Sequence, residues 1–347
     1  MDKKEIIFIG VFPPPYGGVT VKDKLLQDTL KQYNKCDVKV IDVLEAKRKK
    51  WSIPSIVLKS ILAFISGKVI VYGLDSKRLK GYLRIHRFFR NSLSRSTIVT
   101  IGGQFHQTVN SSKILKQTLT QVKEIWVETE GMKQQMVKMG FDNIEVFPNP
   151  KTSTGSCKPR KSSCLEPIRL VYFSQISQEK GIQDIFDLVD LLETSKKIPY
   201  KLELYGHIVP EIKNEFESFL KKSSNISYHG IFDSTKGNLY RKLNEYDLLL
   251  FPSHWMAEGV PGVLVEIKMS GLSVIASNLS YNTEIIRESQ KEGIIIKENY
   301  PEEMYQAIQR CCENRTLLME LKEGSYKSRY RYSLEKYDVL LRRITDL

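Results

Sequence analysis

Residues 246–277 have the sequence YDLLLFPSHWMAEGVPGVLVEIKMSGLSVIAS, and this stretch decides the predicted fold. An apolar run ends in a turn at Pro252, and the pattern that follows it predicts a helix over 262–270. Gly271 is a typical helix stop, and residues 273–277 form another apolar run. The order strand, loop, helix and strand is typical of a parallel sheet with helical connections.

Two carboxylates, Glu258 and Glu266, stand eight positions apart on either side of the predicted helix start. The free N–H groups and the dipole of a helix start bind phosphate, and carboxylates accept hydrogen bonds from sugar hydroxyls. The pair therefore suits a sugar nucleotide. Two glutamates at this spacing also occur by chance near helices, so the pattern alone leaves a structural role open.

The same alternation of β-rich runs and helical patterns continues along the whole chain. Strands are predicted at 6–11, 38–43, 68–73, 96–102, 124–128, 168–173, 201–205, 226–229, 248–251, 274–276 and 293–297. Residues 301–347 are predicted to be helical throughout. We therefore expect an α/β fold of two Rossmann-like, doubly wound domains that face each other across a cleft at the carboxyl ends of their strands.

A stretch rich in Ser, Thr, Pro and charge between Asn149 and Pro167 is typical of a linker. It predicts a first domain over 1–150, a linker over 151–167 and a second domain over 168–325. The last residues, 326–347, are expected to form a C-terminal helix that packs back on the first domain.

Cysteine content and hydropathy limit the class of protein. The 347 residues include five cysteines whose spacing fits neither a disulfide framework nor a zinc site, which favours a reducing, cytoplasmic compartment. No window reaches about 18 uninterrupted apolar residues, so no transmembrane helix is predicted. The chain has no D-x-D sequence and no metal-ligand spacing, and we therefore expect a metal-independent protein without a cofactor. Nor does it contain G-x-S-x-G, which argues against an α/β-hydrolase.

Several motifs together resemble those of the retaining glycosyltransferases of family 4, which adopt the glycosyltransferase-B (GT-B) fold. The glutamate pair resembles their E-x7-E signature, and Gly17-Gly18 resembles their glycine-rich first loop. Residues 171–181 contain a match to their G-R-L-x-x-x-K-G segment, with Gln175 in place of the arginine. The resemblance covers most of the chain and is closest to enzymes of bacterial surface-polysaccharide assembly.

The resemblance implies a role for each matching residue. Glu266 is expected to bind the ribose hydroxyls of the donor, and Glu258 the hydroxyls of the donor sugar. His106 is expected near the transferred sugar, and Lys180 on the diphosphate, where its ammonium neutralises the leaving group. The remaining donor-binding candidates are Gly17, Gly18, Gln175, Gly206 beside the nucleobase, Val260, Pro261, Gly262 and Val263.

The net charge of +13 is concentrated in one window. Residues 1–150 contain 25 Lys and Arg against 13 Asp and Glu, whereas residues 151–347 contain 28 against 27. Between Lys47 and Arg95, thirteen basic residues accompany a single Asp75. A solvated surface without a partner would scatter its charges, so this concentration indicates an anionic partner.

Apolar residues accompany the basic window. Lys47 to Lys50 precede Trp51, and residues 53–65 are apolar at near-helical spacing. Basic and apolar faces together favour an interfacial helix that docks on the anionic inner face of the cell membrane. The alternative is that residues 53–65 pack in the core of the first domain.

The prediction is therefore a glycosyltransferase that moves a sugar from a nucleotide-sugar donor to a sugar acceptor. Peripheral docking on the membrane implies a lipid-linked acceptor. Two alternatives remain: a sugar-nucleotide epimerase or phosphorylase on the same fold, or a basic nucleic-acid-binding protein. No nucleic acid is expected as a partner, because the basic window lacks a zinc, KH or RNP motif.

Overall fold

The computed structural model describes residues 4–14, 17–33, 36–163, 165–233 and 237–345. The chain divides into two compact units. Unit 1 consists of Met1–Pro150, Ala257–Val260 and Leu334–Leu347, and unit 2 consists of Lys151–Met256 and Pro261–Ser333. The predicted second domain included residues 257–260, which contain Glu258, but the structure groups this segment with unit 1.

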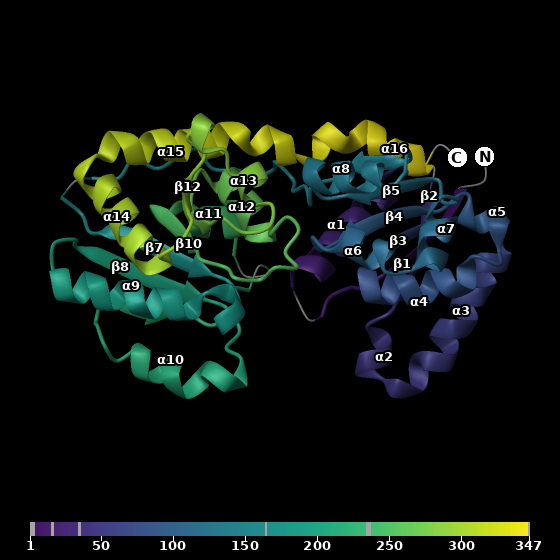
Figure 1. Ribbon diagram of the computed structural model, residues 1–347, viewed down its shortest axis with the longest axis horizontal. Helices are drawn as coiled ribbons and strands as arrows, with labels where there is room; N and C mark the ends of the chain where they lie inside the picture. Colours follow the sequence, from purple (N-terminus) through teal and green to yellow (C-terminus); the bar gives the residue numbers. More distant parts are fainter. Residues whose placement is uncertain (1–3, 15–16, 34–35, 164, 234–236, 346–347) are drawn as a thin grey trace. The chain divides into compact units, whose positions relative to one another are not determined.

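Unit 1 contains a six-stranded parallel sheet (Figure 1). Its strands, in spatial order, are β2 (Cys36–Asp42), β1 (Lys4–Gly10), β3 (Val69–Asp75), β4 (Thr97–Ile101), β5 (Glu124–Val127) and β6 (Ile144–Val146). The sequence did not predict β6, because three residues with a glutamate in the middle give too weak a pattern. The order of the strands reverses between β1 and β3, which makes this point the topological switch point of the sheet.

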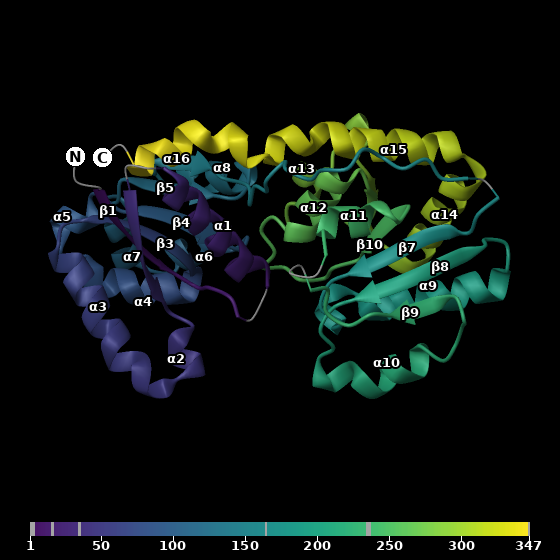
Figure 2. The same cartoon turned by 180° about the vertical axis from the view of Figure 1, so that it is seen from behind.

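Helices cover both faces of this sheet (Figures 1 and 2). They are α1 (Gly18–Gln32), α2 (Glu45–Arg48), η1 (Lys50–Ser52), α3 (Ile53–Ile65), α4 (Ser76–His86), α5 (Arg90–Leu93), α6 (Phe105–Asn110), α7 (Lys113–Leu119), α8 (Glu130–Lys138), η6 (Leu334–Tyr337) and α16 (Asp338–Thr345). On one face, α1 and α16 pack in a core that contains Phe8, Trp126 and Phe147. The end of the chain is thereby part of unit 1, through Leu341 and Ile344 of α16.

Unit 2 contains a second six-stranded parallel sheet. Its strands, in spatial order, are β12 (Ile294–Ile296), β11 (Ser273–Ser277), β10 (Leu248–Phe251), β7 (Ile168–Phe173), β8 (Tyr200–Tyr205) and β9 (Ile226–Tyr228). Numbered within the unit, this is the 3-2-1-4-5-6 order of the Rossmann fold, with its switch point between β7 and β10. The predicted fold class, two Rossmann-like α/β domains, is confirmed.

The helices of unit 2 include the predicted helix after β10. They are η2 (Gln178–Lys180), α9 (Ile182–Ser195), η3 (Pro210–Ile212), α10 (Lys213–Phe219), α11 (Leu239–Asn244), α12 (Gly262–Ser270), α13 (Asn282–Ile285), η4 (Glu288–Gln290), α14 (Tyr300–Glu313), α15 (Arg315–Ser328) and η5 (Arg329–Tyr332). Helix α12 has the predicted bounds and ends at Gly271, whose φ of 65° lies in the left-handed region that glycine adopts readily.

The prediction of continuous helix over 301–347 is wrong. Asn314 separates α14 from α15, because its side chain accepts a hydrogen bond from Leu317 N–H at 3.0 Å and caps the second helix. A second interruption lies between α15 and α16, where 3-10 turns flank the extended Ser333. Among the helices of the described ranges, none is long and apolar enough to cross a membrane.

Candidate active site

Two loops at the switch point of unit 2 pack against each other and share a hydrogen bond. One follows β7 and contains Gln175, Lys180 and Gly181, and the other follows β10. Gly181 has a φ of 76°, and a Cβ there would lie 2.0 Å from the carbonyl oxygen of Pro252, so only glycine fits. His254 N–H donates to the carbonyl of Glu179 at 2.8 Å. Ligands of open α/β sheets bind outside the carboxyl ends of the strands at such a point.

Lys180 lies in this pair of loops. Its ammonium is 5.9 Å from the ring centroid of Trp255, within the range of a cation–π contact. The ammonium is thereby held at the carboxyl edge of the sheet, near the end of β10. A positive group in this position suits the phosphates of a bound ligand.

Gly206 closes the neighbouring turn after β8. Its φ is 146°, and a Cβ there would lie 1.7 Å from the carbonyl oxygen of Ser174, so a side chain is excluded. Its N–H donates to the carbonyl of Gly230 at 2.9 Å. Gln175 is exposed beside this turn, where its backbone carbonyl accepts a hydrogen bond from the Tyr172 hydroxyl at 2.8 Å.

A cluster of aromatic rings lies at the ends of β7, β8 and β9, and sequence reasoning missed most of it. Tyr205 stacks on Phe173 at 5.3 Å and on the imidazole of His229 at 5.0 Å, and Phe232 lies 6.1 Å from Phe173. The carboxylate of Glu203 lies 3.1 Å from His229 Nε2. Stacked rings beside Gly206 offer a surface for a planar base. The available signal was the aromatic residue near the end of each strand.

Helix α12 presents its N-terminus at the carboxyl edge of the same sheet. Pro261 is the N-cap residue, and Gly262 and Val263 form the first turn. Glu266 follows one turn later, and its carboxylate lies 3.2 Å from the ammonium of Lys151. Lys151 is only 5% exposed, and its N–H donates to the carbonyl of Tyr332 at 2.9 Å.

The ion pair with Lys151 bears on the role of Glu266. The carboxylate is not an isolated acceptor, because a buried ammonium fixes its position and charge. Sequence reasoning missed Lys151, which stands in the predicted linker immediately after Pro150 and carried no motif. Its only signal was a charged residue next to the domain boundary.

The segment Ala257–Val260, which contains Glu258, is anchored within unit 1 by three hydrogen bonds. Gly103 N–H donates to the carbonyl of Ala257 at 2.9 Å, and the Asn149 amide donates to the carbonyl of Val260 at 3.0 Å. The N–H of Val260 donates to Glu128 Oε2 at 3.1 Å. The amide of Val260, a predicted phosphate contact, is therefore already engaged in this structure.

Glu128 is itself part of a buried ion pair that the sequence did not indicate. Its Oε1 lies 2.6 Å from the ammonium of Lys22, and both side chains are 4% exposed. The same ammonium donates to the carbonyl of Thr100 at 3.0 Å. A Cβ on Gly259 would lie 1.8 Å from Glu128 Oε2, so glycine is required where the segment passes this carboxylate.

The other candidates in unit 1 follow β1 and β4. Gly17 is the N-cap residue of α1 and Gly18 its first residue, and no atom of the described residues lies within 4 Å of a Cβ built on either. The backbone of Gly17, with φ of −159°, suits any residue, so the glycines leave open space at the helix start. His106 lies in α6, three residues beyond the Gly102-Gly103 turn, and its buried Nδ1 has no hydrogen-bond partner among the described residues.

The predicted site residues thus belong to two groups. Unit 2 holds Gln175, Lys180, Gly206, Pro261, Gly262, Val263 and Glu266, and unit 1 holds Gly17, Gly18, His106, Glu258 and Val260. The glutamate pair is divided between them. Within the described ranges, no three His, Cys, Asp or Glu side chains form a group that could hold a metal ion.

Comparisons with known proteins agree with this geometry. Residues 158–328 match the family described as Glycosyl transferases group 1. An uncharacterized glycosyltransferase of Haemophilus influenzae is 23% identical over 290 residues, which are 79% of this chain and 73% of that protein.

Solved structures of similar fold cover the whole chain. HepE of Anabaena, in complex with UDP, has a TM-score of 0.72 at 13% identity and covers 99% of this chain and 100% of its own. The apo form of the lipopolysaccharide outer core galactosyltransferase WaaB has a TM-score of 0.66 at 15% identity and covers 99% and 98%. The fold is that of the GT-B glycosyltransferases. Residues 158–328, which make up most of the second unit, match the domain of the group 1 family, and the protein is a glycosyltransferase.

Proposed function

We propose that this protein is a metal-independent retaining glycosyltransferase that takes a sugar from a nucleotide-sugar donor and adds it to a lipid-linked sugar in surface-polysaccharide assembly. The observation that carries the proposal is the edge of the unit 2 sheet. There, the start of α12, the ammonium of Lys180 and the turn at Gly206 surround the switch point. Solved HepE structures contain UDP and UDP-glucose, which supports a nucleotide sugar as the donor.

Each group has a task in donor binding. The amides of Gly262 and Val263 and the ammonium of Lys180 hold the diphosphate. Glu266 accepts hydrogen bonds from the ribose hydroxyls, and Lys151 keeps its carboxylate in place. The aromatic cluster around Tyr205 supports the base.

In the transfer step, the bond between the sugar C1 and the phosphate oxygen breaks, and a bond from C1 to the acceptor oxygen forms on the same face. The proton of the acceptor hydroxyl passes to the departing phosphate, and the pair of electrons of the broken bond leaves with it. Glu258 binds hydroxyls of the donor sugar, and His106 lies near the acceptor. Lys180 stabilises the negative charge that grows on the leaving diphosphate.

Calorimetry with nucleoside diphosphates separates these roles, after a thermal-shift screen of UDP-, GDP-, ADP- and CMP-sugars has identified the base. Glu266→Ala should weaken binding of nucleoside and diphosphate alike, whereas Lys180→Ala should weaken only the diphosphate. Glu258→Ala should lower turnover and leave nucleotide affinity intact. Unchanged affinity in Glu266→Ala, or equal losses for both ligands in Lys180→Ala, would contradict the assignment. Lys213→Ala, an exposed lysine of the same unit, is the control.

The metal-independent mechanism has its own test. Turnover should continue in EDTA at the rate measured without it. A loss of turnover in EDTA that manganese restores would contradict this part of the proposal.

The proposed membrane contact rests on α3, whose two faces are both apolar. Ile56, Ala63 and Phe64 pack inward. The opposite face exposes five large apolar side chains, each 48–63% accessible: Ile53, Val57, Leu58, Leu62 and Ile65. Trp51, which precedes the helix, is 77% accessible. One face of this helix therefore packs in unit 1, as one of the two predicted alternatives has it, and the other face is exposed.

Cations border this apolar face. Lys47, Lys49 and Lys50 are exposed just before it, and Lys59 lies within α3. A continuous exposed apolar face on a monomer marks an interaction site, and each cation near an anionic lipid surface contributes about 1 kcal/mol. We propose that this surface docks on the anionic inner face of the cell membrane, where a lipid-linked acceptor is accessible.

Sedimentation with liposomes tests the docking. Binding should require anionic lipid, fall as salt rises, and weaken in Leu62→Ser and in Lys49→Gln. Val339→Ser, a similarly exposed apolar residue on α16, should bind like the native protein. Equal retention on neutral and anionic vesicles, or retention on neither, would mean that the α3 surface has another partner.

A further inference from the structure

A basic cavity lies at the amino-terminal edge of the unit 2 sheet, opposite to the edge that holds the donor-binding candidates. It has a volume of about 300 Å³. It is lined by the linker before β7 and the first turns of α15: Arg160, Lys161, Ser162, Arg315, Thr316, Leu318, Met319 and Lys322. Four of these eight side chains are cationic. No motif of the sequence points to this cavity.

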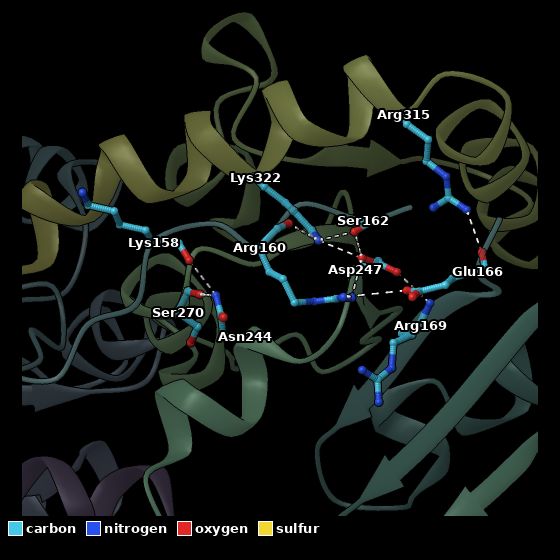
Figure 3. Close-up of polar contacts among 10 residues, drawn as sticks. All are labelled: Lys158, Arg160, Ser162, Glu166, Arg169, Asn244, Asp247, Ser270, Arg315 and Lys322. Carbon is cyan, nitrogen blue, oxygen red and sulfur yellow. Dashed lines mark hydrogen bonds and ion pairs between the residues drawn. The ribbon is translucent and has the colours of Figure 1, made fainter. Parts of the chain in front are cut away.

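A buried carboxylate at its base fixes the cavity wall (Figure 3). Asp247, immediately before β10, accepts hydrogen bonds from Arg169 N–H at 2.9 Å and from the Lys322 ammonium at 2.8 Å. Lys322 also donates to Ser162 Oγ at 3.0 Å and to the carbonyl of Arg160 at 3.3 Å. These contacts hold the linker against α15, so the guanidinium of Arg160 is positioned before any ligand arrives.

The charge balance of the cavity is positive. Burial opposes ionisation of Asp247, yet the Lys322 ammonium keeps the pKa of that carboxyl below its usual value. Asp247 is shared between two cations, because the Lys322 ammonium lies 2.8 Å and the Arg160 Nη2 lies 3.3 Å from the same Oδ1. Glu166 is 61% exposed and lies 4.0 Å from Arg160, too far for a strong pair. Arg160, Lys161 and Arg315 are thus only partly neutralised.

Hydrogen-bond donors in the cavity are unused. Arg315 Nη2 donates to the carbonyl of Glu166 at 3.2 Å, but its buried Nε and Nη1 have no partner among the residues that the structure describes. The buried Nε of Arg160 likewise has no hydrogen-bond partner among the described residues. Buried guanidinium N–H groups without acceptors are unfavourable and indicate a ligand that satisfies them. Arg315 and Thr316 also open α15, whose free amides favour an anion.

We propose that this cavity binds the phosphate group of a small phosphorylated molecule. The guanidinium of Arg315 brings a positive charge and N–H groups on Nε and Nη1 that can donate to phosphate oxygens, and Arg160 and Lys161 also line the cavity. The volume is at the lower end of small-molecule sites, enough for phosphate with a small substituent. This site is separate from the donor site, and the proposal does not depend on the activity of the enzyme.

Calorimetric titration with inorganic phosphate and with glucose 6-phosphate, at constant ionic strength set by chloride, tests the proposal. The two ligands distinguish a site for free phosphate from one for a phosphate ester. Arg315→Gln should reduce the affinity of the better ligand about tenfold or more. Arg315→Lys, which keeps the charge and loses the N–H groups of Nε and Nη1, should reduce it nearly as much. Lys327→Gln, on the exposed side of α15, should change nothing.

The donor site also attracts phosphate, so the titrations are repeated in Lys180→Ala. The binding event lost in Arg315→Gln should persist in Lys180→Ala with unchanged affinity. Binding of neither ligand, binding equal to that of chloride, or binding that Lys180→Ala removes and Arg315→Gln preserves would overturn the proposal. Circular dichroism confirms that the variants fold, because Arg315 leaves the contact between Lys322 and Asp247 untouched.

Discussion

Glu128→Gln is the substitution that best tests how unit 1 holds the segment with Glu258. Glutamine has the size of glutamate and its Oε1 can still accept the hydrogen bond from Val260 N–H, but it has no charge. The ammonium of Lys22, 4% exposed, would keep only the carbonyl of Thr100 as an acceptor among the described residues and would lose its counter-charge. Removing one partner of a buried ion pair costs about 3–5 kcal/mol.

A double-mutant cycle measures the coupling energy between Lys22 and Glu128. Lys22→Met should also be destabilising, because it leaves the carboxylate of Glu128 buried with one hydrogen bond. The double variant should lose less than the sum of the single variants, with a coupling of about 1–3 kcal/mol. Urea unfolding is followed by tryptophan fluorescence, in which the fully buried Trp126 reports unit 1 and the half-exposed Trp255 reports unit 2.

Two results would refute this reasoning. One is a loss of less than about 1 kcal/mol in Glu128→Gln, and the other is strict additivity in the cycle. Either would mean that the pair is solvated in solution. The matched control is Lys24→Met, which removes a lysine of the same helix from an exposed pair with Asp28 and should cost less than about 0.5 kcal/mol.

Three further predictions concern unit 2. Lys151→Met should weaken nucleoside diphosphate binding about tenfold in calorimetry, because Glu266 loses the cation that holds it; an unchanged affinity would exclude that role. Gly206→Ala should lower the melting temperature, since its Cβ would lie 1.7 Å from a carbonyl oxygen, whereas Gly81→Ala, with open space around its Cβ, should not. Burial lowers the pKa of Lys268 to about 8, below its value in the unfolded chain, so the unfolded chain holds this proton more tightly. The free energy of unfolding, measured relative to Lys268→Met, should therefore rise between pH 8 and 10. A difference that does not change with pH would contradict the lowered pKa.

The fold was largely predictable because its signals are local. Fully buried parallel strands give uninterrupted apolar runs such as residues 248–251, and Gly271 stops a helix through its own backbone conformation. The failures were elements with weak local signals. Strand β6 is three residues long, and the interruption at Asn314 depends on a cap within an otherwise helical pattern.

The candidate site was predictable only in part, for a related reason. Lys180, Gly206 and Glu266 stand directly after strands or in a helix start, where sequence order fixes their place. Lys151 contacts Glu266, 115 positions away in the chain, and Glu128 contacts Val260, 132 positions away. No local sequence pattern predicts such contacts. Ion pairs of this kind follow from the tertiary fold alone.

Glu258 and Glu266 belong to different units, so different contacts fix the position of each residue. Glu266 is placed by helix α12 of unit 2 and by the ammonium of Lys151. The backbone around Glu258 is placed instead by Gly103, Glu128 and Asn149, none of which lies near it in sequence. Asn149→Ala should therefore lower turnover through the position of Glu258 while leaving nucleotide affinity unchanged. A parallel loss of affinity would mean that the segment contributes to nucleotide binding directly, and the proposed separation of binding from transfer would fail.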